Sequence, residues 1–241
     1  RIINFAKRNF KEIIRDPLSI IFAILLPLFL LFIFQQFNIP SENYKLENFT
    51  PGIIIFSFSF ISLFTATLIA KDRNTSLLIR LGTSPMKPIE YVLGYTLAVL
   101  PIVILQNVLF FIVAVFLGLN FDINVIFTIL ISIPISILFI ALGILIGCVT
   151  TEKSASGVSS IIVQLVAFTS GMYFSTDMVG DFFANVCKVL PFSRCVDITK
   201  GILNNNYQDL LNAIIIVFVY TIIVVSISII VFKKKMVSDN K

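Results

Sequence analysis

Residues 125–151 read VIFTILISIPISILFIALGILIGCVTT and contain no Asp, Glu, Lys or Arg. A helix needs about 20 apolar residues to cross the hydrocarbon core of a bilayer, so this run is long enough to span it. Backbone groups in lipid must bond to one another, which leaves helices and closed barrels as spanning structures. Barrel strands alternate polar and apolar residues, whereas this run is continuously apolar. The stretch therefore predicts a membrane-spanning helix.

Five more runs are of the same kind, and Glu152 with Lys153 separates the fourth from the fifth. The six runs are residues 18–37, 51–70, 91–119, 125–151, 155–175 and 210–232. Hydrophobic residues make up 58% of the chain and charged residues 13%, against about 25% charged residues in soluble domains. This composition excludes a soluble enzyme, a disordered tail and a disulfide scaffold. We expect residues 1–241 to form one all-α transmembrane domain with six spans.

The distribution of Lys and Arg predicts the orientation, because basic residues gather on the cytoplasmic side of a membrane. Of the 18 Lys and Arg residues, 14 lie before the first run, after the second, after the fourth or in the tail. The other four are Lys45, Lys188, Arg194 and Lys200. This asymmetry places both termini in the cytoplasm, which requires an even number of spans.

Residues 1–16 precede the first run and differ from it in pattern. Ile2, Ala6, Phe10 and Ile13 recur at helical spacing. The other face carries charged residues: Lys7, Arg8, Lys11, Glu12 and Arg15. This pattern predicts an amphipathic helix in the inner headgroup layer. A plain charged flank of the first span is the alternative.

The sequence lacks the residues needed for zinc binding, ion-coupled transport or ATP hydrolysis. The chain has three Cys and no His, so it offers no cluster of about four ligands for a structural zinc ion. Ion-coupled transporters place ionisable residues inside the bilayer, whereas these runs hold only polar groups such as Gln106, Asn107 and Gln164. Such groups commonly join helices. The sequence also lacks the phosphate-binding loop of an ATPase.

The loop after the second run reads KDRNTSLLIRLGTSPMKPIEYVLG over residues 71–94. Asp72 or Asn74 can begin a short helix there, and Gly82 with Pro85 can end it. The leucines at 77, 78 and 81 would give this helix an apolar stripe. Docking against a cytoplasmic protein is one interpretation, and a connector lying on the membrane surface is the other.

The second long loop, residues 176–209, is expected on the outer side. Residues 178–190 are apolar enough to enter the outer leaflet, and Pro191 would turn the chain back. A re-entrant helical hairpin is therefore expected, with a plain amphipathic loop as the alternative. A turn at Pro191 can also bring Cys187 and Cys195 together, so we weigh a disulfide between them against two free thiols.

Taken in order, these features resemble the membrane subunit of type 2 ABC exporters, a permease family. The 1–16 segment resembles the family's elbow helix, and residues 71–90 its coupling loop. The segment 170–203 resembles its outer region, with Ser170-Gly171, then Leu190-Pro191, then Asp197. The resemblance extends over the full chain in the order and spacing of these features. Asn74, Tyr95 and a missing proline after Ser170-Gly171 depart from the usual pattern and leave the subfamily open.

The resemblance implies the roles of particular residues. Coupling to the ATPase would fall on Asp72, Arg73, Thr75, Leu77, Leu78, Arg80, Leu81, Ser84, Pro85 and Met86. The outer gate would involve Ser170, Gly171, Phe182, Phe183, Pro191 and Asp197. The chain itself would carry no catalytic residue, metal or cofactor, because ATP and Mg bind to the partner ATPase.

The resemblance also implies the setting and the function. The chain would be a multi-pass permease in a bacterial cytoplasmic membrane, paired with a second permease and with cytoplasmic ATP-binding cassette ATPases. It would export an amphipathic substrate such as a drug, an antimicrobial peptide, a lipid or a glycan, as in multidrug or peptide resistance. Two alternatives stay open: a non-transporting immunity or partner-binding protein, and an ATP-independent secondary transporter.

Overall fold

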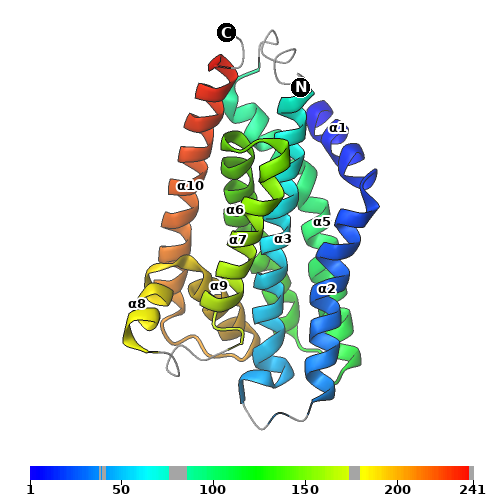
Figure 1. Ribbon diagram of the computed structural model, residues 1–241. Helices are drawn as coiled ribbons and strands as arrows, with labels where there is room; N and C mark the ends of the chain where they lie inside the picture. The colour runs from blue at the N-terminus through cyan, green and yellow to red at the C-terminus, as the bar shows by residue number, and fades with distance from the viewer. Residues whose placement is uncertain (38, 40–41, 76–85, 174–179, 239–241) are drawn as a thin grey trace.

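The computed structural model describes residues 1–37, 39, 42–75, 86–173 and 180–238, and every regular element in them is a helix (Figure 1). Half of the coupling loop, residues 76–85, lies outside this range. The elements in chain order are α1 (Ile2–Ile14), α2 (Pro17–Gln36), the 3-10 turn η1 (Glu42–Tyr44), α3 (Leu46–Asn74), α5 (Pro88–Phe116), α6 (Ile123–Val149), α7 (Glu152–Thr169), α8 (Asp181–Val189), α9 (Pro191–Leu203) and α10 (Leu210–Ser238).

Each of the six apolar runs coincides with a helix, which confirms the all-α prediction. Within the described residues, α3, α5, α6 and α10 are long and apolar enough to cross a membrane. The apolar part of α2, Ala23–Gln36, is shorter, and α7 has 18 residues. The structure is therefore that of a helical membrane protein, and the count of six spans remains a prediction.

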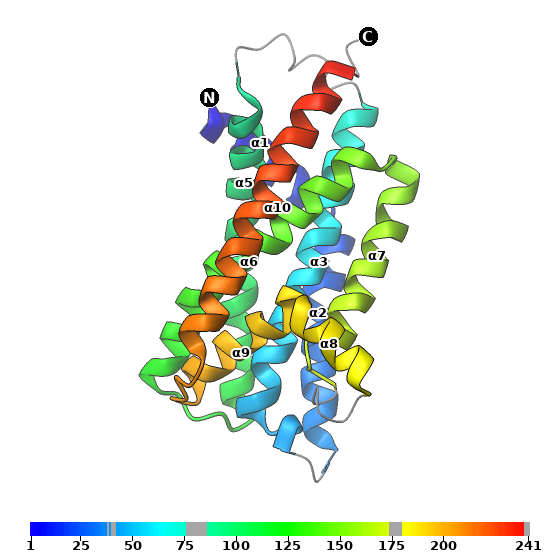
Figure 2. The same ribbon diagram turned by 90° about the vertical axis from the view of Figure 1, so that its left-hand side faces the viewer.

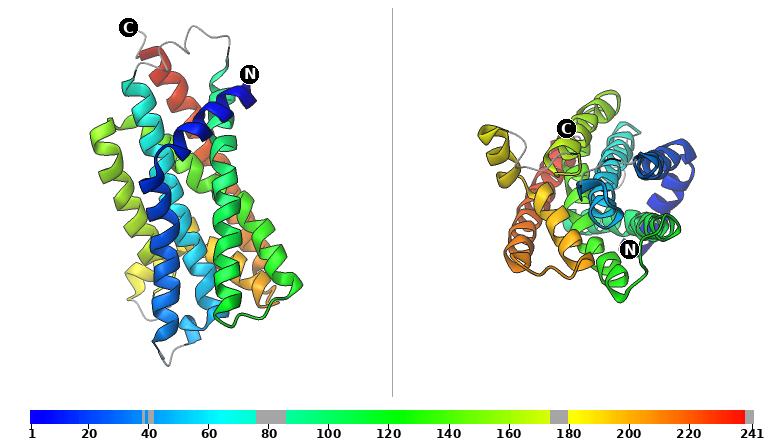
Figure 3. Two further views of the ribbon diagram at one scale, coloured as in Figure 1. Left: turned by 90° about the vertical axis from the view of Figure 1, so that its right-hand side faces the viewer. Right: turned by 90° about the horizontal axis from the view of Figure 1, so that it is seen from below.

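Helix α3 is the centre of the bundle, and 83% of its most apolar 18-residue stretch is buried. It packs against α2, α5, α6, α7 and α9, and it lies between α2 and α10 when the bundle is seen from below (Figure 3). Some of its buried hydroxyls bond to their own helix: Ser57 donates to the Ile54 carbonyl at 2.6 Å and Thr65 to the Ile61 carbonyl at 2.8 Å. These bonds allow a Ser-rich helix to be buried among apolar neighbours.

Two glycines set the close approach of α6 to α3. A Cβ atom at Gly147 would lie 2.7 Å from the Ala66 carbonyl oxygen and 2.9 Å from the Ile69 Cβ, and one at Gly143 would meet Ser62 and Thr65. Small residues are the usual means by which membrane helices approach closely. Gly157 on α7, by contrast, has nothing within 4 Å of its Cβ position.

A backbone carbonyl that Pro27 leaves without a helical partner in α2 is bonded from α5. Pro27 lies inside α2 and has no N–H, so the carbonyl of Ala23 four residues earlier loses its helical partner. The Gln106 side chain of α5, which is fully buried, donates to that carbonyl at 3.1 Å. Gln106 therefore joins two helices, as expected for a polar group inside the spans.

Both α1 and the last turns of α10 lie at one end of the bundle, which we call the terminal end (Figures 1 and 2). The helix α1 crosses this end obliquely (Figure 3). It is amphipathic, as predicted, but its buried residues, including Phe5 and Ala6, face α5 rather than lipid. The Phe5 ring stands edge-on to Tyr91 and Tyr95, at centroid distances of 5.4 and 5.1 Å.

At the opposite end, two short helices precede α10 (Figure 2). Helix α8 ends at Val189 and α9 begins at Pro191, with Leu190 extended between them. Helix α9 packs against α6 and α10. This is the helical pair expected for residues 176–209, and residues 174–179 lie outside the described range.

We expect Gly147→Ala to destabilise the chain by about 1–3 kcal/mol, because the added methyl group would push α6 away from α3. Gly157→Ala is the matched control, expected to be neutral or slightly stabilising, since its site is open and alanine favours helix. Thermal unfolding in detergent compares the two. Equal melting temperatures for both variants would contradict the packing assigned to Gly147.

Candidate functional site

Four consecutive residues close α3 and begin the coupling loop: Lys71, Asp72, Arg73 and Asn74. We call them the 71–74 cluster. Successive residues of an α-helix are rotated by about 100°, so four neighbours point in four directions around the axis. Each side chain of this cluster can therefore reach a different part of the bundle.

Asp72 is the buried member of the cluster, 1% exposed. Its Oδ2 accepts a hydrogen bond from Arg8 Nη1 of α1 at 2.7 Å and another from the Tyr95 hydroxyl of α5 at 2.8 Å. Arg8 also donates to Asn9 Oδ1 at 2.8 Å, which fixes the guanidinium in place. A buried carboxylate needs such partners, because an unpaired charge in the protein interior is strongly unfavourable. Asp72 thus ties α1 and α5 to the end of α3.

Lys71 makes a second connection to α1. Its Nζ donates to Glu12 Oε1 at 2.8 Å, one helical turn from Arg8. This hydrogen bond lowers the pKa of the Glu12 carboxyl from its ordinary value of 4.5. Two ion pairs spaced along α1 therefore fix both its position and its direction on α3.

Arg73 binds the last turn of α6. Its Nη1 donates to the carbonyl oxygens of Gly147, Cys148 and Thr150 at 3.2, 2.6 and 3.0 Å. The final carbonyls of a helix have no partners within it, and a cation there complements the helix dipole. Arg73 thus acts as a C-terminal cap supplied from a neighbouring helix.

Asn74 reaches α7. Its amide donates to the Glu152 carboxylate in the first turn of that helix. Thr151 caps the same turn, with its hydroxyl 2.8 Å from that of Ser154. With this contact the 71–74 cluster joins α3 to α1, α5, α6 and α7.

The structure describes some of the residues expected to couple to an ATPase. Asp72 and Arg73 are in the cluster, the Thr75 hydroxyl donates to the Asp72 carbonyl at 3.2 Å, and Met86 is half-buried against the core. The remaining members lie outside the described residues: Leu77, Leu78, Arg80, Leu81, Ser84 and Pro85.

Sequence reasoning missed the partners of the cluster. Arg8 and Glu12 were assigned only to the charged face of an amphipathic helix, and Glu152 only to a gap between two runs. Tyr95 was noted as a departure from the family pattern, whereas it binds Asp72. One usable signal was Asp72 itself, an acidic residue among basic neighbours at the end of an apolar run.

The residues expected at the outer gate lie away from the cluster, toward the opposite end of the bundle (Figure 2). Ser170 follows α7 and is buried, and Gly171 has a φ of +76°, a conformation that favours glycine. Pro191 is the buried first residue of α9, and Asp197 pairs with Arg194 at 3.3 Å. Phe183 is partly buried, and the Phe182 side chain is outside the described set.

The disulfide weighed for Cys187 and Cys195 is not formed in the structure. Both residues are free and buried. The chain does turn at Leu190-Pro191, and the Ser193 hydroxyl donates to the Cys187 carbonyl at 2.9 Å. A hydrogen bond from a side chain to the backbone, not a covalent bond, links the two helices at this point.

The fold and the cluster define a multi-pass helical membrane protein whose termini share one end. The model of the ABC-2 type transporter family matches residues 2–204, most of the chain. The chain belongs to this family and is the membrane permease of an ABC transporter. Permeases of the family generally pair with ABC ATPase subunits, which bind the ATP. No curated protein matches the chain.

We expect Asp72→Asn to cost about 2–3 kcal/mol of stability, because it leaves Arg8 and Tyr95 without a charged acceptor. Arg8 is partly exposed, so the cost falls below that of a fully buried pair. Glu42→Gln, which removes the exposed Glu42–Lys45 pair at the opposite end, is the control and should change nothing measurable. Denaturant unfolding in detergent compares them, and equal midpoints would refute the role of Asp72.

The Glu12–Lys71 pair makes stability depend on pH in one direction. A carboxyl with a lowered pKa contributes stability above its ordinary value of 4.5 and loses it as pH falls through the folded value. The melting temperatures of wild type and Glu12→Gln should therefore differ by a constant amount from neutral pH down to about 5. The gap should close below 4.5, and a gap that widens on acidification would contradict the pairing.

Proposed function

We propose that this permease is the membrane half of an ATP-driven exporter that moves an amphipathic substrate out of a bacterial cell. Separate ATPase subunits would dock on the coupling loop, residues 71–90. The 71–74 cluster carries the proposal, because it places the base of that loop in direct contact with four other helices. A displacement of the loop would then move the whole terminal end as one body.

The same contacts suggest how the motion travels. Helix α3 is continuous from Leu46 to Asn74 and packs closely on α6 through Gly143 and Gly147. Close-packed interiors transmit displacement rather than absorb it. A shift at the 71–74 cluster would therefore reach the centre of the bundle and, through the contacts of α9 with α3 and α6, the outer helices.

The terminal end would face the cytoplasm. The basic residues of α1 and Lys71, Lys87, Lys153 and Lys233 all belong to helix ends gathered there (Figure 1). This agrees with the bias of Lys and Arg toward the cytoplasmic side. In this orientation the six apolar helices form six spans, and α8 with α9 forms the outer re-entrant pair.

Helix α7 supports pairing with a second permease. Ser156, Ser160 and Gln164 are exposed and lie four residues apart, so they share one face of this helix. A row of polar side chains facing lipid is unfavourable, and such rows usually meet another helix or a polar path. A second permease packed on this face would cover the row, with the substrate passing between the two copies and leaving past α8 and α9.

Affinity purification from native membranes in mild detergent tests the proposal. We expect an ABC ATPase to co-purify with the chain and to be lost from the triple variant Leu77→Ala, Leu78→Ala, Arg80→Ala. The double variant Phe121→Ala, Tyr207→Ala is the control, since it removes exposed apolar side chains at the opposite end. Intact chain without any ATPase would contradict the exporter and favour an immunity or ATP-independent function.

A further inference from the structure

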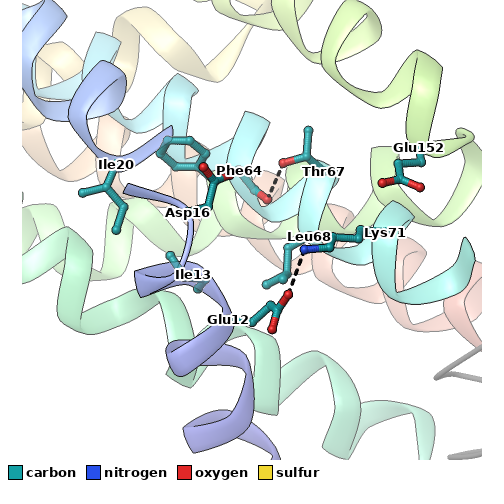
Figure 4. A pocket seen from close by; sticks show the side chains of 9 residues that line it. All are labelled: Glu12, Ile13, Asp16, Ile20, Phe64, Thr67, Leu68, Lys71 and Glu152. Atoms are coloured by element: carbon teal, nitrogen blue, oxygen red, sulfur yellow. Dashed lines mark hydrogen bonds and ion pairs between the residues drawn. The ribbon is translucent and has the colours of Figure 1, made fainter. Parts of the chain in front are cut away.

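A cavity of about 210 Å³ lies beside the 71–74 cluster (Figure 4). It is an open cavity lined by the end of α1, the start of α2, the last turns of α3 and the first residue of α7. Neither the family match nor the proposed coupling role assigns a ligand to it. Its lining combines a charged rim with an apolar floor.

The rim carries an excess of negative charge. Glu12, Asp16 and Glu152 line the cavity together with one cation, Lys71. Figure 4 shows Glu12 and Glu152 on either side of Lys71. Arg8 and Arg15 also act on Glu12, but neither lines the cavity. The surface that a ligand would touch is therefore acidic.

The carboxylates of the rim are held in position by the protein. Glu12 accepts from Lys71 at 2.8 Å, Glu152 accepts from Asn74, and Asp16 interacts electrostatically with Lys71. Groups that are already ordered lose little entropy when a ligand binds. A carboxylate oxygen has room for more than one donor, so these partners leave acceptor capacity for a ligand.

The cavity becomes apolar along α3. Lys71, Leu68 and Phe64 lie on one face of this helix, and both Leu68 and Phe64 are largely buried. Seven residues of helix correspond to roughly 10 Å, about the depth over which a leaflet changes from headgroups to acyl chains. Ile20 of α2 adds to the apolar side. The polarity of the cavity thus follows that of the inner leaflet beside it.

We propose that this cavity binds the ammonium end of a cationic amphiphile taken from the inner leaflet. The acidic rim would accept N–H donors or a quaternary ammonium, and Ile20, Leu68 and Phe64 would contact the first carbons of the tail. An anionic headgroup would meet like charges on the rim. Naming this ligand as cargo rests on the proposed export function; the binding itself does not.

The volume of the cavity favours a ligand that is bound by its head and is not fully enclosed by the protein. Pockets that enclose a drug-sized ligand measure about 300–1,000 Å³, and this cavity holds about 210 Å³. It fits a small charged head with a short part of its chain, while the remaining chain stays in lipid. This site therefore selects a substrate by the charge of its head.

Binding of spin-labelled single-chain amphiphiles to the full chain in a neutral detergent tests the proposal. The probes share one alkyl chain and differ in the head: trimethylammonium, sulfate or maltoside. We expect the trimethylammonium probe to bind about tenfold more tightly than the sulfate probe. Equal or inverted affinities would overturn the proposal. The assay contains no ATP, so its outcome is separate from whether an ATPase co-purifies.

Two variants localise the binding. The double variant Glu12→Gln, Glu152→Gln should weaken the trimethylammonium probe about fivefold to tenfold and leave the maltoside probe unchanged. Glu47→Gln at the opposite end removes a carboxylate outside the cavity and should change neither. Thr67→Phe fills the cavity while keeping every charge, and it should weaken the cationic probe even if the double variant fails to fold. Unchanged binding in a folded variant would refute the site.

Discussion

The terminal end of this bundle depends on one buried carboxylate. Asp72 is almost fully enclosed, and a charge in such a place is tolerated only with good partners. The partners come from two other helices, Arg8 of α1 and Tyr95 of α5, so satisfying the charge fixes where both helices lie on α3. Arg73 and Asn74, next along the chain, bind the end of α6 and the start of α7. The geometry of five helices is therefore set within one helical turn.

This arrangement connects the coupling loop mechanically to the centre of the bundle. The coupling loop begins at the residues that hold the helices together, and α3 continues from them through the centre of the bundle. Helix α6 packs against α3 at Gly143 and Gly147, where the two helices are so close that even an added methyl group would not fit. The acidic cavity shares Lys71 and Glu152 with the cluster and its partners. A movement of the loop would carry this cavity along with the terminal end, which would link the position of a bound substrate to the ATPase.

The sequence was sufficient for features that repeat along the chain and insufficient for those that join distant parts. Uninterrupted apolar runs predicted the helices, and residue spacing predicted the amphipathic α1. No periodicity relates Arg8 to Asp72, 64 positions apart, or Asp72 to Tyr95, 23 positions apart. The apolar face of α1 was assigned to the membrane surface because the sequence does not show that Phe5 packs on Gly94. The cysteine pair was suggested by the turn at Pro191, but that turn leaves both thiols unbridged.

We infer that the 71–74 cluster makes the terminal end a single rigid body. Spin labels at Lys11 of α1 and Lys153 of α7, both exposed, report the distance across this end. The measurement compares the permease–ATPase complex without nucleotide and with ATP trapped. We expect the same distance distribution in both states, whereas the distance between labels at Lys11 and at Asn120, at the opposite end, should shift. A change between Lys11 and Lys153 as large as that shift would show that α1 and α7 move independently and would contradict the account.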